Sequence, residues 1–597
     1  MQEASGNRPL LIYDGDCAFC GYWARYWQQL TGDSVRYRPY QDVASQFPEI
    51  PPADFRRAVQ YVAPDGRVSS AAEASFLTLS HARGKAFWLT LYRKLPGFAA
   101  ICELAYAFTA AHRAAFYRIS LFLWGRNFGP PRYDLVAFLF LRGFGLIYFC
   151  AFVSFAVQAL GLIGSHGILP LAEFVDAGSR GLGTERFFLM PMLFWWSASD
   201  VAIQAVCWAG AALSLLLVFN RLPRVSLLLL HVLYLSLLYG GQAFMSYQWD
   251  TYLLETGFLA LLLSVSTAPG IWLLRWLLFR FMFMSGVVKL LSGDPNWWSL
   301  SALSYHFFTQ PLPTPLAWYA AQLPPAALRF ATGGTLAIEL VLPFLIFCPR
   351  RLRFFGACAI LLLQSVIALT GNYNWFNLQT MLLCLTLFDD AAVRRLVRLL
   401  SVREPPAAPH RALTVSVTAV GVVIVLCSLV QMDLRFGGRP PALAQALDRV
   451  IEPVHVVSSY GLFAVMTTER DEIVIEGSND GVDWREYEFR YKPGDVMRRP
   501  PWNIPHQPRL DWQMWFAALE DPRGLRWFAG FLRRLLENEP AVTSLLQRNP
   551  FPGKPPTYVR ALFYDYRYAE FGEKPAGRWW NRRLLGLYFP PARLKGE

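Results

Sequence analysis

The sequence predicts a multi-pass α-helical membrane protein with an α/β domain before the membrane region and an extracytoplasmic, β-rich α+β domain after it. The first observation is composition: 54% of the 597 residues are hydrophobic and 17% are charged, whereas soluble domains are about 25% charged. The second is that long apolar runs concentrate between residues 134 and 432. The third is that the two flanking regions show strand, turn and short-helix patterns instead of such runs.

The region 8–125 is typical of a compact α/β domain. Leu10–Tyr13 is a short strand pattern, and it leads through Asp14-Gly15-Asp16 to Cys17 and Cys20, which begin a helical pattern. A Cys-x-x-Cys pair at a strand-to-helix turn places its first sulfur at a helix N-terminus, where free amides and the helix dipole stabilise a thiolate. A structural zinc site needs four ligands, and the chain has one such pair. We therefore favour a redox pair and expect no metal.

The rest of this region contains a strand pattern near residues 35–38, a hairpin turn at Pro64-Asp65-Gly66 and mostly helical sequence up to Trp124. The chain starts with the polar segment MQEASGNRPL, which lacks the apolar core of a secretory signal. We therefore expect this domain to stay in the cytosol.

The region 134–432 alternates apolar runs with short connections. A helix of about 20 apolar residues crosses a bilayer, at a rise of ~1.5 Å per residue. About nine runs are candidates, although the eighth is short enough to be re-entrant. They are 135–158, 199–219, 225–243, 251–267, 271–291, 326–347, 353–370, 374–388 and 411–430.

Arginines are unevenly distributed among the connections, and cytosolic connections of membrane proteins are rich in Lys and Arg. With the N-terminus inside, the outer connections carry only Arg180 and Arg186, both in one long loop. The inner side has many more, and Arg275 and Arg280 also lie toward the inner end of the fifth span. The bias predicts a cytosolic N-terminus and a C-terminal domain on the other side. It also accounts for the net charge of +13, so we expect no nucleic-acid partner. The inner connections carry Arg221, Arg224, Arg350, Arg351, Arg353, Arg394, Arg395, Arg398, Arg403 and Arg411.

That topology brings polar residues from distant parts of the sequence to the outer face. A charge within a membrane segment needs a partner and is a functional hypothesis. We expect Glu255 to pair with Lys289, and Glu339, in mid-span, to be the costliest carboxylate; for Lys289 the alternative is an interfacial lysine that snorkels. Two interpretations stay open: a polar pocket, or an aromatic belt with helix-packing hydrogen bonds. The candidates are Asp250, Glu255, Lys289, His306, Asn372, Asn374 and Asn377, rimmed by Trp249, Trp297, Trp298 and Trp375.

The region 433–597 is expected to form the outer domain. EIVIEGSNDGVDWREYEFRY alternates apolar and polar residues around Ser478-Asn479-Asp480-Gly481, which predicts a β-hairpin. Residues 525–536 and 542–546 have helical patterns. No spacing supports a triad or a zinc motif around His455 and His506, and no cysteine follows Cys427. Aromatic and arginine residues favour a protein-binding surface, with His506, Arg509, Asp511 and Trp512 as binding candidates.

The segment YDGDCAFC resembles the DCC family of thiol-disulfide oxidoreductase-like domains, over roughly the first fifth of the chain. The resemblance implies a thioredoxin-like fold, with Cys17 as the attacking thiol and Cys20 as the resolving one. A cytosolic thiol partner is a further candidate. Because this pair is expected in the cytosol, it cannot oxidise an exported protein directly.

Several stretches together resemble the lipase maturation factor family, over residues 135–590. They include SYQWDTYLLETGFLALLL, GNYNWFNLQTMLLCLTLFDD and YGLFAVMTTERDEIVIEGSNDGVDWREYEFRY. The resemblance implies a membrane-bound maturation factor or chaperone that assists exported client proteins, with a lipase as one candidate, and no cofactor. The fusion to an oxidoreductase-like domain argues for a bacterial inner membrane.

A shorter stretch, FMFMSGVVKLLSGDPNWW, resembles the HTTM membrane region of vitamin K-dependent γ-glutamyl carboxylase. That resemblance implies an alternative function, a membrane enzyme that uses Lys289 as its base. A partly desolvated, paired lysine can be tuned toward neutrality for proton abstraction.

Overall fold

The computed structural model describes residues 8–126, 129–396 and 411–594. The chain divides into two compact units. The first contains Met1–Arg132 with Cys348–Arg353, and the second contains Tyr133–Phe347 with Phe354–Glu597. The first unit thus holds the predicted α/β domain, and the second holds the helical bundle together with the C-terminal domain. Arg398 and Arg403, which entered the arginine count, lie outside the described residues.

The first unit is built on a four-stranded sheet in the order β2-β1-β3-β4. β1 runs parallel to β2 and antiparallel to β3, and β3 pairs with β4 across the predicted hairpin turn. A βαβ unit followed by a hairpin and a helix is the thioredoxin-like arrangement that the resemblance implied. The strands are β1 (Leu10–Tyr13), β2 (Arg36–Pro39), β3 (Gln60–Val62) and β4 (Val68–Ser70).

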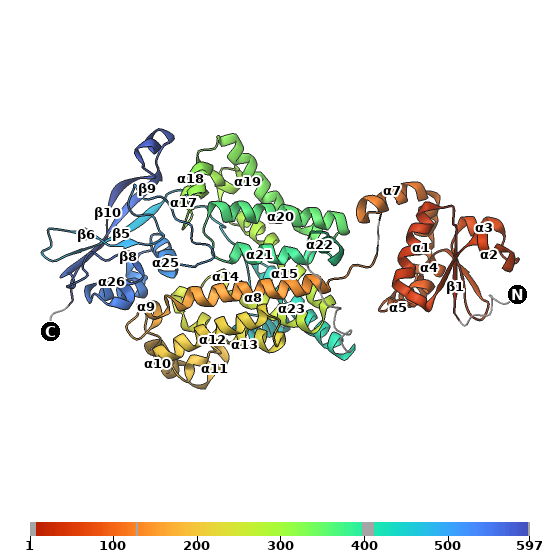
Figure 1. The fold of residues 1–597 in the computed structure, drawn as a ribbon, viewed down its shortest axis with the longest axis horizontal. Helices are drawn as coiled ribbons and strands as arrows, with labels where there is room; N and C mark the ends of the chain where they lie inside the picture. The colour runs from red at the N-terminus through yellow and green to blue at the C-terminus, as the bar shows by residue number, and fades with distance from the viewer. Residues whose placement is uncertain (1–7, 127–128, 397–410, 595–597) are drawn as a thin grey trace. The chain divides into compact units, whose positions relative to one another are not determined.

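Both faces of this sheet are covered, because successive side chains of a strand point to opposite faces. Leu10 and Ile12 pack with Phe55 on one face, and Leu11 packs with Tyr61 on the other. The helices of this unit are α1 (Ala18–Thr31), α2 (Tyr40–Val43), α3 (Pro52–Arg57), α4 (Ala71–Ser80), α5 (Ala86–Lys94), α6 (Phe98–Ala111) and α7 (Arg113–Trp124) (Figure 1).

In the described part of the chain, seven helices are long and apolar enough to cross a membrane. The most buried of them is α15, with 83% of its apolar window inside the protein, so it forms the centre of the bundle. The seven are α8 (Asp134–Ala156), α12 (Asp200–Val218), α13 (Pro223–Gly240), α15 (Thr267–Leu291), α19 (Pro325–Leu340) with its extension to Phe347, α20 (Arg350–Thr370) and α23 (Arg411–Arg435).

Two further helices match the remaining two predicted spans. α14 (Gln248–Val265) carries Asp250 and Glu255 in its first half, which lowers its mean hydropathy. α21 (Phe376–Cys384) has nine residues, fewer than the roughly 20 that a crossing helix needs. Nine crossings therefore stay a prediction. The shorter helices around the bundle are α9 (Ala159–Ile163), α10 (Leu171–Leu182), α11 (Arg186–Leu189), α16 (Pro295–Trp298), α17 (Ala302–Thr309), α18 (Pro315–Ala321), α22 (Asp390–Leu396) and α24 (Ala442–Ile451).

The C-terminal domain contains a sheet in the order β10-β9-β5-β6 and a small sheet of β7 and β8. The predicted hairpin is present, because β5 pairs antiparallel with β6. The helix expected over 542–546 is wrong in extent: α27 ends at Thr543, and Leu546 begins β8. The elements are β5 (Asp471–Ser478), β6 (Arg485–Glu486), β7 (Glu488–Phe489), α25 (Arg509–Ala517), α26 (Arg526–Leu536), α27 (Pro540–Thr543), β8 (Leu546–Arg548), β9 (Tyr558–Tyr568) and β10 (Trp580–Ala592).

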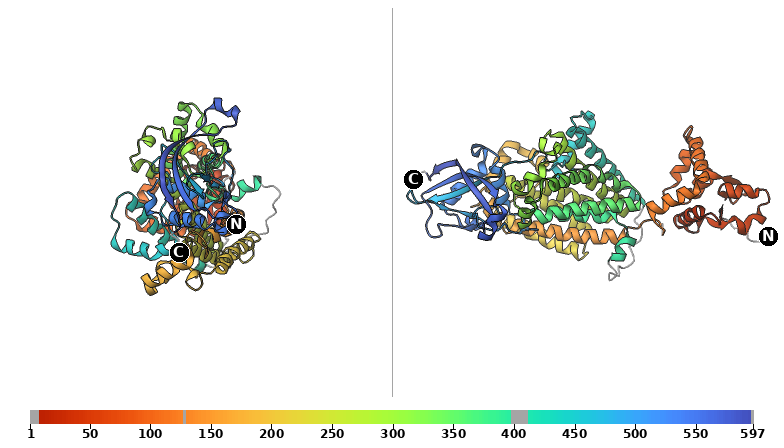
Figure 2. Two further views of the ribbon diagram at one scale, coloured as in Figure 1. Left: turned by 90° about the vertical axis from the view of Figure 1, so that its left-hand side faces the viewer. Right: turned by 90° about the horizontal axis from the view of Figure 1, so that it is seen from above.

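This sheet lies at one end of the helical bundle (Figures 1 and 2). One cluster of buried apolar side chains continues from the bundle into the C-terminal domain and includes Leu253 of α14 and Trp512 of α25. The two parts therefore share a core. The predicted fold class, a helical membrane protein with a thioredoxin-like domain before it and a β-containing domain after it, is confirmed.

Candidate functional site

A fully buried ion pair joins the bundle to the C-terminal domain. Arg509, the first residue of α25, donates to both carboxylate oxygens of Asp250 on α14, at 2.6 and 2.7 Å. Tyr234 of α13 donates a third hydrogen bond to Asp250 at 2.6 Å, and Arg509 also donates to the carbonyl of Phe244 at 3.0 Å. Asp250 and Arg509 are both inaccessible to solvent. A two-pronged pair of this kind fixes orientation as well as distance.

A second buried pair consists of Glu255 on α14 and Arg280 on α15. Glu255 accepts two further hydrogen bonds from the C-terminal side, from the Ser458 amide at 2.9 Å and the Tyr460 hydroxyl at 2.5 Å. Arg280 donates to the Ser458 carbonyl at 3.1 Å. Arg280 was expected near the inner end of the fifth span, but the structure places it against the C-terminal segment. Its charge is therefore used inside the protein rather than for orientation.

The expected pairing of Glu255 with Lys289 is wrong, because Lys289 binds Glu339. The two oxygens of Glu339 lie 2.8 and 3.0 Å from Lys289 Nζ, and the Ser285 carbonyl lies at 3.0 Å. The reason is close packing of α15 and α19: a Cβ at Gly286 would lie 3.0 Å from Glu339 Cβ. The glycine one turn before Lys289 lets Glu339 approach, and the mid-span carboxylate thus has a partner.

The three candidate asparagines surround the turn between α20 and α21, and all are buried. Asn372 bonds residues of the C-terminal domain, the Pro501 carbonyl and the Asn503 amide, each at 2.9 Å. Asn374 donates to the side-chain oxygen of Gln507 at 2.7 Å. Asn377 instead donates to Gln364 within the bundle at 2.7 Å. Two of the three therefore take part in the same contact as Asp250.

The candidates of the C-terminal domain lie on the other side of this contact. Arg509, Asp511 and Trp512 are buried, so they do not form the exposed binding surface that their composition suggested. Asp511 accepts the amides of Tyr491 and Lys492 at 2.8 and 2.9 Å. The Trp512 ring packs edge-on against Trp249, with centroids 4.7 Å apart. We call the contact of Asp250, Glu255, Asn372 and Asn374 with residues 458–512 the junction.

The two candidate histidines also contact both parts. His506 shares a hydrogen bond with the Ser154 hydroxyl of α8 at 3.0 Å. His306 packs edge-on against Phe463, and burial, with the charge of Lys289, lowers its pKa to about 4. Of the four rim tryptophans, Trp298 is exposed and Trp249, Trp297 and Trp375 are buried. The side chains thus bond one another across the junction, and a ligand-binding role for them stays a prediction.

The stability of the second unit is expected to depend on His506 below neutral pH. Burial, followed by the charges of Arg509 and Arg490, lowers the pKa of His506 from 6.5 to about 4. The unfolded chain therefore binds a proton that the folded chain does not, and stability is lost as pH falls from 6.5 to about 4. The loss due to this group approaches ~1.4 kcal/mol per pH unit. Unfolding of the wild type and His506→Gln should be compared across this range; parallel curves would contradict the assignment.

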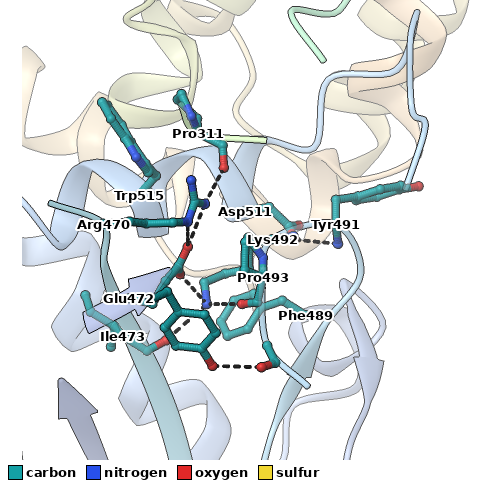
Figure 3. A network of polar contacts seen from close by, with 12 residues as sticks. Pro311, Arg470, Glu472, Ile473, Phe489, Tyr491, Lys492, Pro493, Asp511 and Trp515 are labelled. Atoms are coloured by element: carbon teal, nitrogen blue, oxygen red, sulfur yellow. Dashed lines mark hydrogen bonds and ion pairs between the residues drawn. The ribbon is translucent and has the colours of Figure 1, made fainter. Parts of the chain in front are cut away.

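Three buried charges escaped the sequence reasoning, because charged side chains are almost never fully buried unless they are paired. Arg470 and Lys492 both bind Glu472, at 2.7 and 2.8 Å (Figure 3). Arg470 also donates to the carbonyl of Phe308 in the last turn of α17 and to those of Gln310 and Pro311 in the loop that follows. The sequence signal is the run of four charged residues, Glu469 to Glu472, at the start of β5. This cluster adds a third charged connection between the two parts, after those made by Asp250 and by Glu255.

The cysteine pair of the first unit has the predicted geometry. Cys17 is the N-cap of α1, and its sulfur accepts the Cys20 amide at 3.2 Å. Burial, followed by the hydrogen bond with Cys17, raises the pKa of the Cys20 thiol. Cys20 therefore stays protonated at neutral pH, as a resolving thiol should. In the described residues, no group of three or more His, Cys, Asp or Glu is placed to hold a metal ion.

Replacing Cys20 with serine is expected to trap a mixed disulfide. Cys17 would attack a partner disulfide, form one S–S bond and release one partner thiol. Without Cys20 the second exchange, which releases the partner and closes the Cys17–Cys20 bond, cannot occur. Non-reducing electrophoresis after mixing with a disulfide-containing probe should show the adduct for Cys20→Ser and none for Cys17→Ser. Equal adducts in both variants would contradict these roles.

The comparisons with known proteins agree with this architecture. Residues 135–395 match the lipase maturation factor transmembrane domain, 456–590 match the lipase maturation factor C-terminal domain, and 11–119 match the DCC1-like thiol-disulfide oxidoreductase family. No solved structure matches the chain.

Relatives that match about three quarters of the chain support the same family assignment. Lipase maturation factor 2 of Xenopus laevis is 36% identical over 76% of this chain and 82% of its own length. The human protein of that name is 35% identical over 76% and 82%. Lipase maturation factor 1 of Bos taurus is 33% identical over 76% and 89%. These matches support the maturation-factor interpretation over the carboxylase-like alternative at Lys289. The chain is a membrane protein of the lipase maturation factor family that carries a DCC1-like thiol-disulfide oxidoreductase domain at its N-terminus.

Proposed function

We propose that this chain assists the maturation of exported client proteins, with a lipase as the first candidate, through its C-terminal domain. The observation that carries the proposal is that the relatives named lipase maturation factors cover both the bundle and the C-terminal domain. The junction adds a physical reason. Buried charge pairs and a shared core hold the C-terminal domain in one orientation on the bundle, so its exposed surface is presented at a fixed place near the membrane.

The client contact is proposed on β10, because the aromatic residues expected to bind are buried in the junction. β10 is an edge strand, and its Leu584, Leu585 and Leu587 are 55, 47 and 59% exposed. A bulge brings Leu584 and Leu587 opposite Tyr564 and Leu562, two residues apart on β9, so both face the same way. An unpaired, apolar strand edge can accept an extended segment of another chain.

The test is an exported lipase produced together with this protein. Leu584→Lys with Leu587→Lys is expected to lower the lipase activity per lipase molecule severalfold, because charges on an edge strand oppose added strands. Val482→Lys, at another exposed apolar position of the same domain, is the matched control. Cys17→Ser with Cys20→Ser should leave lipase activity unchanged if the two domains serve different partners. Full lipase activity with the β10 variant would refute the client contact.

The proposed orientation places the C-terminal domain outside the cytosol. Asp390 of α22 caps the first amides of α8 at 3.0–3.2 Å, whereas Ser154 near the other end of α8 bonds His506. Arg394 and Arg395 of α22 therefore belong to the end of the bundle opposite the C-terminal domain, the end that the positive-inside rule assigns to the cytosol. A bacterial inner membrane is the proposed location, on the basis of the fused oxidoreductase-like domain.

In this arrangement the N-terminal domain exchanges thiols and disulfides with a cytosolic partner through Cys17 and Cys20. The observation that favours this second activity is the sulfur of Cys17 at the start of α1, within hydrogen-bonding distance of the Cys20 amide. The trapping experiment with Cys20→Ser tests it without reference to lipase.

A further inference from the structure

The first unit leaves apolar side chains exposed on its last three helices, α5, α6 and α7. On α6 the exposed positions recur at helical spacing, and all are apolar: Ile101, Leu104 and Phe108 are 64, 72 and 60% exposed, and the other exposed positions are alanines. Phe87 of α5 and Ile119 and Phe122 of α7 are also exposed, and α6 packs against both helices. We call these six large residues the α5–α7 apolar surface. Soluble domains seldom leave such a surface uncovered.

The same segment carries nearly all the excess positive charge of this domain. Between residues 83 and 126 there are seven basic residues and one acidic residue, Glu103. Glu103 is already bonded to the Tyr92 hydroxyl at 2.8 Å and to the Glu73 amide at 3.1 Å. Residues 8–82, by contrast, contain seven basic and eight acidic residues. The basic residues are Arg83, Lys85, Arg93, Lys94, Arg113, Arg118 and Arg126.

The covalent chain keeps this surface close to a bilayer. α7 ends at Trp124 and the first membrane helix, α8, begins at Asp134. An extended chain of that length reaches about 35 Å at most, so the end of α7 stays within that distance of the start of α8 and the three helices can reach the lipid surface. A helix with a wholly apolar exposed stripe and basic flanks is the pattern that lies in a membrane interface, with its apolar side chains at the acyl boundary and its cations near anionic head groups.

We propose that the α5–α7 apolar surface docks on the anionic surface of the membrane from which α8 emerges. Leu104 and Phe108 enter the interface between head groups and acyl chains, and the exposed lysines and arginines of the segment lie at the phosphates. Arg113 is not among them, because it donates to the carbonyls of Arg56 and Arg57. The redox pair is thereby held at the membrane surface, where it meets membrane-associated thiol partners rather than freely diffusing ones. The docking extends beyond the proposed maturation and exchange functions and depends on neither.

The test uses the full chain in nanodiscs with a photo-cross-linking amino acid at one position. The probe replaces Leu104 in one protein and Arg67, in the exposed hairpin turn far from α6 in sequence, in the control. In nanodiscs of phosphatidylcholine mixed with phosphatidylglycerol, we expect lipid adducts from position 104 and none from position 67. Adducts should decrease in pure phosphatidylcholine and in high salt, because screening weakens the attraction.

A pair of variants separates docking from folding. Docking should slow hydrogen exchange of the α6 amides in anionic nanodiscs. Leu104→Glu with Phe108→Glu is expected to abolish this slowing, while Val68→Glu, at an exposed position on β4, leaves it intact. Both substituted sites are exposed, so Cys17 reactivity should stay at the wild-type value. Equal lipid adducts from positions 104 and 67 would overturn the proposal. So would cross-links from position 104 to a second protein or to other parts of this chain in place of lipid.

Discussion

Replacing Arg509 with alanine is expected to destabilise the second unit by about 3–5 kcal/mol, because it leaves the Asp250 carboxylate buried without its cation. Of its side-chain partners within the described residues, Asp250 would keep only Tyr234, whose hydroxyl donates at 2.6 Å. Such a loss is large relative to the typical stability of a folded domain, about 5–15 kcal/mol. Chemical unfolding of the detergent-solubilised chain, followed by tryptophan fluorescence, measures the change.

A double substitution separates the buried charge from the packing. Asp250→Leu together with Arg509→Met should recover much of the loss, since apolar residues of similar size often replace a buried ion pair at little cost. Arg533→Ala is the matched control, because its partner Glu537 lies on a surface where Arg533 is 70% exposed, and exposed pairs contribute about 0–1 kcal/mol. If Arg509→Ala were no more destabilising than Arg533→Ala, the junction could not depend on this pair.

The second large effect is expected from Arg470→Lys, although that change preserves the charge. Arg470 uses its planar guanidinium to bind Glu472 and the Pro311 carbonyl (Figure 3) and also the carbonyls of Phe308 and Gln310. A lysine offers one nitrogen and cannot span these acceptors. With each lost hydrogen bond worth about 0.5–1.5 kcal/mol, we expect a loss of roughly 2–4 kcal/mol and faster proteolysis of the loop after α17.

Arg567→Lys provides the comparison for that experiment. Arg567 is 67% exposed and contacts Asp565 at 3.3 Å, so the same exchange of guanidinium for ammonium should change little there. Proteolysis rates for Arg470→Lys equal to those of the wild type would show that charge alone holds the loop, against the geometry of Figure 3.

Local sequence patterns predicted the elements whose conformation depends on residues adjacent in the sequence. The turn Pro64-Asp65-Gly66 and the pair Cys17 and Cys20 are set by a few residues each, and the structure has the hairpin and the helix start that they indicate. Seven of the predicted membrane helices follow from long runs that are mostly apolar. These features need no knowledge of what packs against them.

Partners across the bundle could not be predicted in the same way. The sequence suggests a pair of Glu255 and Lys289 because both lie near outer helix ends. In the structure α19 packs closely on α15 at Gly286, so Lys289 pairs with Glu339, and Glu255 pairs with Arg280. Trp512 was expected on an exposed binding surface, since aromatic and arginine residues are enriched both at protein-binding sites and at buried contacts between domains. Composition does not distinguish the two, and the shared core does.

The central claim, that the thiol domain and the client domain lie on opposite sides of the membrane, is tested most directly by cysteine accessibility. The exposed residues Arg67 and Val482 would each be changed to cysteine in the full chain, and intact cells treated with a membrane-impermeant maleimide. We expect Val482→Cys to be labelled in intact cells and Arg67→Cys only after permeabilisation. Labelling of both in intact cells would contradict the claim, place Cys17 and Cys20 beside exported clients, and make oxidative folding the leading interpretation.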